Sequence, residues 1–73
     1  MMEDKVLIFG KDECPYTTQA REDYAQKKIA FQYVNVLEDK DAMTQMLGFS
    51  KGKRLVPVIV EKGQVYLGYG GGS

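Results

Sequence analysis

The sequence of 73 residues contains no His and no Trp, and it has a single Cys. One Cys cannot form an internal disulfide, and without His it cannot complete a thiolate–imidazole zinc site, so no metal site is expected. The same absence excludes catalysis by Ser–His or Cys–His pairs. A chain of this length buries only about 60% of its unfolded surface. The fold must therefore rest on its apolar core, which a hydrophobic content of 44% can supply.

Charge and hydropathy exclude further classes of partner. Ten basic and ten acidic side chains cancel, whereas nucleic-acid binding usually needs a basic excess. The longest apolar run, residues 55–60, is too short to span a bilayer. The first five residues lack the layout of a signal peptide. We therefore expect one domain over residues 1–73, cytoplasmic and reducing surroundings, and neither nucleic acid nor a membrane as partner.

The apolar pattern predicts four strands and two helices in the order β-α-β-α-β-β. The strands are expected over residues 5–9, 31–36, 56–60 and 65–67, and the helices over 15–28 and 40–47. Pro15 suits the first position of a helix, and Asp39 suits the N-cap of the second one. Strands separated by a helix imply a right-handed parallel crossover, and the last two strands form a hairpin. The prediction is an α/β fold with a four-stranded mixed sheet.

Cys14 is the side chain best suited to act as a nucleophile. It lies just before Pro15, at the positive end of the first predicted helix, where backbone N–H groups stabilise a thiolate. Lys11 adds a favourable charge, whereas Asp12 and Glu13 oppose the thiolate unless they point away. Inert burial is the alternative for a lone Cys. A core Cys, however, rarely follows three charged residues and precedes a Pro that starts a helix.

Residues 14–17, Cys-Pro-Tyr-Thr, resemble the Cys-Pro-Tyr-Cys active-site motif of glutaredoxins. Residues 56–57, Val-Pro, resemble the Val-Pro of that family, whose proline is cis. Residues 68–69, Gly-Tyr, follow the hairpin where the family has Gly-Gly or Gly-Phe. The three motifs stand in the family's order over nearly the whole chain, which implies a thioredoxin-like fold. The family's last helix is expected to be absent or truncated, because the sequence stops at Ser73.

The resemblance implies a site built around Cys14 as the catalytic nucleophile. Eight further residues would bind glutathione or substrate: Lys11, Tyr16, Thr17, Arg54, Val56, Pro57, Gly70 and Gly71. Lys11 and Arg54 would pair with the carboxylates of glutathione. The backbone of Val56 would pair with its cysteinyl part, as an added strand does.

The remaining residues of this implied set have smaller parts. Tyr16 would flank the glutathione, and Pro57, if cis, would turn the preceding backbone toward the thiol. The amides of residues 70–71 would form an anion nest. Each of these residues also has an ordinary alternative. Tyr16 could simply pack at the helix start, and the two cations could be solvated surface charges. Pro57 could mark a strand edge, and the glycines could form a flexible tail.

Thr17 occupies the place of the family's second, resolving Cys, which restricts the implied chemistry to one thiol. Cys14 would attack a glutathione mixed disulfide, and a second glutathione would regenerate it. Thr17 would donate a hydrogen bond to the sulfur. The expected partners are glutathione or another small thiol and oxidised protein thiols, with the chain a monomer. Two alternatives remain: a glutathione-dependent iron–sulfur cluster shared by two chains, and a thioredoxin-fold binding module without catalysis.

Overall fold

The first half of the chain forms a strand, a helix and a second strand. The computed structural model describes residues 6–70. In it β1 (Val6–Gly10) is followed by α1 (Pro15–Gln26) and β2 (Phe31–Asn35). β1 and β2 pair in parallel, with Val6 opposite Phe31. The predicted parallel crossover through a helix is therefore present.

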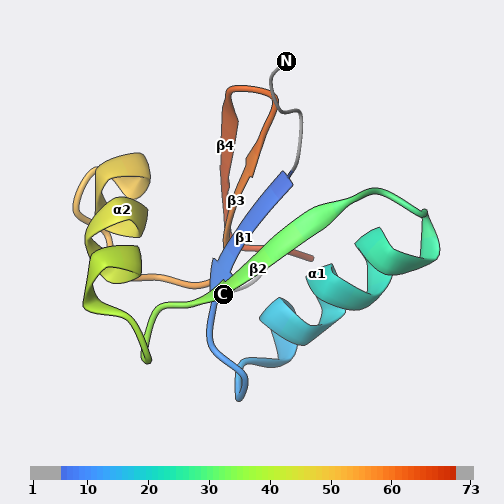
Figure 1. Ribbon diagram of the computed structural model, residues 1–73, viewed down its shortest axis with the longest axis horizontal. Coiled ribbons are helices and arrows are strands. Elements are labelled where there is room, and N and C mark those ends of the chain that lie inside the picture. The colour runs from blue at the N-terminus through green and yellow to red at the C-terminus, as the bar shows by residue number, and fades with distance from the viewer. Residues whose placement is uncertain (1–5, 71–73) are drawn as a thin grey trace.

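The second half adds α2 (Lys40–Ser50) and a hairpin of β3 (Val58–Glu61) and β4 (Gln64–Leu67). β3 is antiparallel to both β1 and β4, which gives a four-stranded sheet in the order β2-β1-β3-β4. Figure 1 shows α1 and α2 on opposite sides of this sheet. Residues 68–70 follow β4 without a third helix. The predicted α/β architecture, a thioredoxin-like mixed sheet, is confirmed.

Three boundaries differ from the predicted ones by two residues or more, and several strand ends differ by one. α1 ends at Gln26, before residue 28, because Lys28 has a left-handed φ of 60°. α2 continues past the predicted residue 47 to Ser50, because Gly48 is accommodated inside the helix and the chain turns only at Lys51. β3 begins at Val58, two residues later than predicted, since the preceding proline has no N–H to donate to a ladder.

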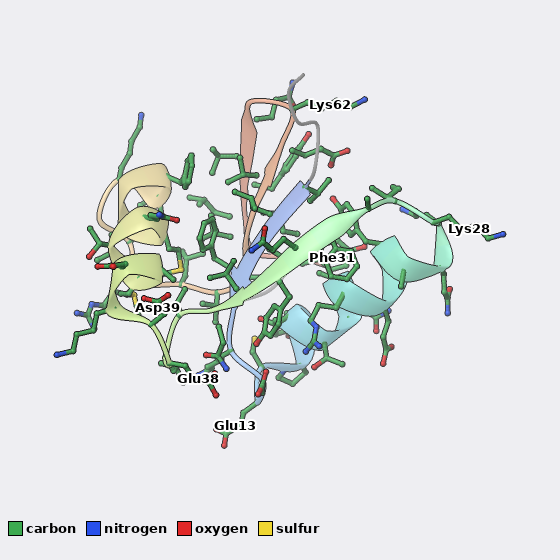
Figure 2. The ribbon with its side chains drawn as sticks, viewed as in Figure 1. Glu13, Lys28, Phe31, Glu38, Asp39 and Lys62 are labelled. Carbon is green, nitrogen blue, oxygen red and sulfur yellow. The ribbon has the colours of Figure 1, made fainter. Side chains whose placement is uncertain are left out.

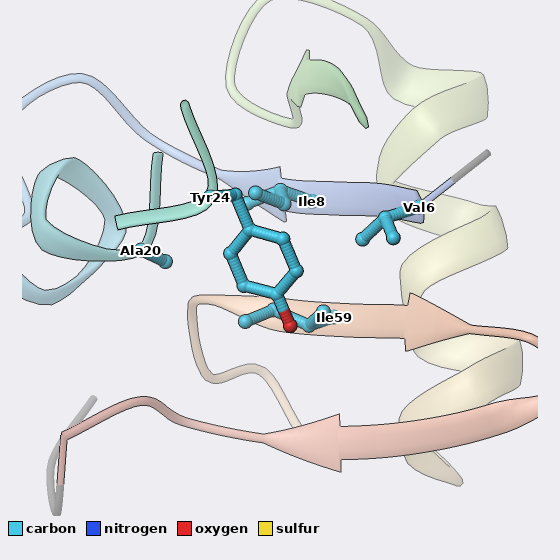
Figure 3. Packing of buried hydrophobic residues seen from close by; sticks show 5 residues of the cluster. All are labelled: Val6, Ile8, Ala20, Tyr24 and Ile59. Carbon is cyan, nitrogen blue, oxygen red and sulfur yellow. The ribbon is translucent and has the colours of Figure 1, made fainter. Parts of the chain in front are cut away.

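Alternating side chains of the central strand β1 supply two separate apolar clusters. Ile8 faces α1, and its neighbour Phe9 faces α2; neither is exposed to solvent. The buried members of the α1 cluster are Val6, Ile8, Ala20, Tyr24 and Ile59, which Figure 3 shows together. The buried members of the α2 cluster are Phe9, Val36, Ala42, Met46 and Val58. These clusters fix both helices on the sheet and so fix where each helix begins.

The N-terminus of α1 lies very close to the end of β1. A Cβ atom on Gly10 would lie 2.5 Å from Cγ2 of Thr17 and 2.6 Å from its Oγ1. Thr17 itself is fully buried. A glycine at position 10 is therefore what allows the first turn of α1 to pack against the sheet.

Candidate active site

Cys14 is the N-cap residue of α1. Its backbone is extended, with φ −85° and ψ 118°, and its carbonyl accepts the first helical hydrogen bond from Thr18 N at 3.1 Å. Its own N–H donates to the carbonyl of Lys11 at 3.3 Å, which closes the turn between β1 and α1. The residue is 5% exposed. The sulfur thus lies where the unpaired N–H groups of the helix converge.

A loop from the other half of the chain faces the sulfur. The Val56–Pro57 peptide bond is cis, and Cys14 Sγ donates to the carbonyl oxygen of Val56 at 3.8 Å. The N–H of Gly68 donates to the carbonyl of Pro57 at 2.8 Å, which ties this loop to the end of the β3–β4 hairpin. The thiol and the loop are 42 residues apart in sequence, so the sheet is what brings them together.

The environment of Cys14 favours the thiolate over the thiol. Burial raises the pKa of Cys14, but the hydroxyl of Thr17, the N–H groups of Thr17 and Tyr16, and the charge of Lys11 all lower it. The net result is a pKa below the ordinary value of the thiol. Among charged groups, Lys11 has the largest effect on this pKa. The pKa of Cys14 is therefore lowered mainly by hydrogen bonds from the first turn of α1 and secondarily by the charge of Lys11 in the preceding turn.

The Thr17 hydroxyl has a different role in each protonation state of the sulfur. Its Oγ1 is buried and finds no hydrogen-bond partner among residues 6–70, with Cys14 donating to Val56. The same hydroxyl nevertheless lowers the pKa of Cys14 by hydrogen bonding. Both observations agree if Thr17 donates to the sulfur once the proton has left, because only the thiolate is a strong acceptor. A hydroxyl unpaired beside the thiol then gains its partner on ionisation.

A cavity of about 350 Å³ opens beside the sulfur. It brings together five of the predicted site residues, Lys11, Cys14, Tyr16, Arg54 and Val56, with Glu13, Pro15 and Leu55 as further lining residues. Figure 2 shows the Glu13 side chain projecting away from the body of the molecule. The cavity therefore combines a nucleophile, two cations and an exposed carboxylate at its rim.

Of the other four predicted residues, three are described by the structure and do not line this cavity. Thr17 and Pro57 are fully buried and do not line the cavity. Gly70 lines a separate groove, and Gly71 lies outside the described residues. The predicted set lacks three of the lining residues, Glu13, Pro15 and Leu55, although each is next in sequence to a predicted one.

The separate groove is larger than the thiol cavity. It has a volume of about 820 Å³ and is bordered by Tyr24, Ile59, Tyr66, Tyr69 and Gly70, among others. Cys14, the one cysteine of the chain, does not border it. Size therefore does not locate the reactive site here. The smaller cavity is the candidate active site because it contains the nucleophile.

Within residues 6–70, no group of three or more His, Cys, Asp or Glu side chains gathers to hold a metal ion. In the same range, neither helix is long and apolar enough to cross a membrane.

The mixed sheet, the cysteine at the start of the first helix and the cis-proline loop facing it define a thioredoxin-like protein. The sequence model of the glutaredoxin family matches residues 6–66. This match covers most of the chain, which therefore belongs to the glutaredoxin family. Thiol–disulfide oxidoreductase chemistry with glutathione as co-substrate is the general activity of that family.

Solved structures agree with this assignment. The chain is similar to a glutaredoxin from Archaeoglobus fulgidus, with 25% identity, a TM-score of 0.79, and coverage of 90% of this chain and 76% of the other. A mutant of the thioredoxin-like protein BC3987 shares the fold at 21% identity and a TM-score of 0.80, covering 92% and 85%. A wheat glutaredoxin also shares the fold, with 22% identity, a TM-score of 0.72, and coverage of 90% of this chain and 63% of the other. A search of curated proteins gave no significant match.

Proposed function

We propose that this protein is a monothiol glutaredoxin that removes glutathione from mixed disulfides. The observation that carries the proposal is the position of Cys14, whose sulfur lies at the N-terminus of α1 and 3.8 Å from the carbonyl of Val56. The helix end stabilises the attacking thiolate. The loop at Val56 offers backbone groups beside it. A nucleophile and a peptide-binding edge are therefore adjacent.

The cavity supports glutathione as the small thiol. An extended tripeptide can pair with the backbone of Val56 in the manner of an added strand. Lys11 and Arg54 offer charges for its two carboxylates, and the ring of Tyr16 offers a flat wall. Gly70 borders the neighbouring groove, which shares Leu55 with the cavity, and Gly71 lies outside the described residues, so the anion nest expected at residues 70–71 stays a prediction.

The proposed cycle uses one protein thiol. The Cys14 thiolate attacks the glutathionyl sulfur of a protein–glutathione disulfide, forming a Cys14–glutathione disulfide and releasing the protein as a thiolate, which takes a proton from water. A glutathione thiolate then attacks the glutathionyl sulfur bound to Cys14. That step releases oxidised glutathione and restores the Cys14 thiolate. Thr17 cannot resolve the intermediate as a second cysteine does, so the second glutathione is required.

The proposed cycle also implies a cellular compartment and a set of partners. A cycle that consumes reduced glutathione belongs in a reducing compartment, and the cytoplasm is the proposed location. The partners are glutathione and glutathionylated proteins, and the protein acts as a monomer. Each cycle engages one copy of the chain, because a single thiol carries both exchange steps.

Turnover of a glutathionylated peptide in the presence of reduced glutathione tests this function. We expect release of the peptide thiol by the wild type and none above background by Cys14→Ser, while both variants show the same circular dichroism spectrum. Equal inactivity of the two with several small thiols would favour the binding-module alternative. A brown, glutathione-containing dimer after anaerobic purification would favour the cluster-binding one.

A further inference from the structure

Three side chains form a polar cluster just outside the thiol cavity. The hydroxyl of Tyr33, on β2, donates to Oδ1 of Asp12 at 2.7 Å. The guanidinium of Arg21, on α1, lies 4.0 Å from the centre of the Tyr33 ring and 3.9 Å from the same Asp12 oxygen. One carboxylate of the turn between β1 and α1 is thus held by a residue from each of two neighbouring elements.

This arrangement determines which charges of the turn reach the sulfur. Lys11 and Glu13 border the thiol cavity, whereas Asp12, which lies between them, does not. Burial, followed by the hydrogen bond to Asp12, raises the pKa of Tyr33 to about 12, so its hydroxyl remains a donor at neutral pH. Asp12 is two residues from Cys14, and a free carboxylate there would oppose the thiolate.

From this geometry we infer that Tyr33 and Arg21 are positioning residues for Cys14: they hold the Asp12 carboxylate away from the sulfur and fix the turn that presents it. The inference deepens the proposed function and rests on it. It gives Tyr33 and Arg21 a role through Asp12, without contact with the substrate. With the Asp12 carboxylate held away, Lys11 is the nearby charge that acts on the Cys14 sulfur.

The test must separate Asp12 from the other charges around the sulfur. The charged and titratable groups that border the thiol cavity are Lys11, Glu13, Tyr16 and Arg54, and those around Tyr33 are Asp12, Arg21 and Glu38. Tyr33→Phe changes none of these charges and keeps the ring under the guanidinium. Asp12→Asn removes the one charge that the inference invokes.

The measurement is the rate of Cys14 alkylation by iodoacetamide as a function of pH, at low ionic strength. In Tyr33→Phe we expect the apparent pKa of Cys14 to rise by at most about 0.4 pH units, the full effect in water of a unit charge brought from far away to about 8 Å. The rise should shrink in high salt. In the Asp12→Asn background, the same substitution should leave the pKa unchanged, because the carboxylate is gone.

Tyr66→Phe is the matched control, since the Tyr66 hydroxyl donates to Gln64 at 2.6 Å on β4; it should leave the Cys14 pKa unchanged. Arg21→Gln, measured with and without Asp12→Asn, gives a second double-mutant comparison, this time from the other residue that holds Asp12. The inference is overturned if Tyr33→Phe leaves the pKa of Cys14 unchanged. It is also overturned if the substitution shifts this pKa as much in the Asp12→Asn background as in the wild type. Failure of the proposed function would appear separately, as wild-type inactivity toward the glutathionylated peptide.

Discussion

The two helices begin in different ways. At the N-terminus of α2, the Asp39 carboxylate accepts hydrogen bonds from the N–H groups of Asp41 at 2.9 Å and Ala42 at 3.4 Å. At the N-terminus of α1, Cys14 occupies the same position, and its side chain makes no cap hydrogen bond within the described chain. An aspartate is a permanent acceptor at neutral pH, whereas a cysteine accepts strongly only as a thiolate.

The start of α2 therefore contributes to the stability of the fold, and the start of α1 contributes to the reactivity of the thiol. The donors of α2 are used in the ground state and stabilise the fold. The donors of α1 are kept for the sulfur, and they lower the pKa of Cys14. Substitutions at the start of α2 should therefore change the free energy of unfolding without changing the pKa of the thiol. Substitutions at the start of α1 should change the thiol.

The largest expected effect comes from pushing the start of α1 off the sheet. Gly10→Ala places a Cβ atom 2.5 Å from Thr17 Cγ2, and overpacking of this kind costs about 1–3 kcal/mol of unfolding free energy. Urea denaturation measures the loss. Gly48→Ala in α2 is the control, because its Cβ atom meets nothing within 4 Å. Gly48→Ala should raise the unfolding free energy by up to about 1 kcal/mol through helix propensity. Changes of the same sign in the two variants would contradict this explanation.

Removing the permanent cap has the next largest effect. Asp39→Ala abolishes both cap hydrogen bonds of α2 and should lower the unfolding free energy by about 1 kcal/mol. The apparent pKa of Cys14 should remain at its wild-type value, because α2 lies on the other side of the sheet. Asp39→Ser, which restores an acceptor, should recover most of the stability. A change in Cys14 alkylation in Asp39→Ala would show that the two helix ends are not independent.

Thr17→Val has the smallest expected effect on the fold and a clear one on the thiol. The substitution removes the hydroxyl that lowers the pKa of Cys14, so we expect this pKa to rise and alkylation near neutral pH to slow. Stability in acid, where Cys14 is a thiol, should be unchanged or higher because an unpaired buried hydroxyl is lost. Thr18→Val makes the same change one residue later and serves as control. An unchanged pKa in Thr17→Val would remove Thr17 from the mechanism.

Local sequence signals were sufficient for the first residues of both helices. Asp39 is followed by a helix that it caps, and Pro15 is the first residue of α1, as predicted. The proximity of Cys14 to residues 56–57 came from the family resemblance. The structure places their backbone beside the sulfur. Both helix starts depend on residues within a few positions of each other, which is why the sequence predicts them.

The rest of the site depends on tertiary contacts that no local pattern encodes. Tyr33 reaches Asp12 across 21 positions of sequence, and either residue alone reads as an ordinary surface side chain. The end of the hairpin carries Gly70 into the other groove, although the family motif grouped it with the thiol. The direction of the Asp12 side chain, which the sequence left open, follows from β2 and α1 packing against the same turn.

Mass spectrometry of the protein after incubation with oxidised glutathione tests the central claim most directly. The chain has one Cys, so an adduct is assigned without ambiguity. We predict one glutathionyl group per chain, none on Cys14→Ser, and loss of the group when reduced glutathione is added. No adduct on the wild type, or an adduct that reduced glutathione does not remove, would contradict the single-thiol cycle.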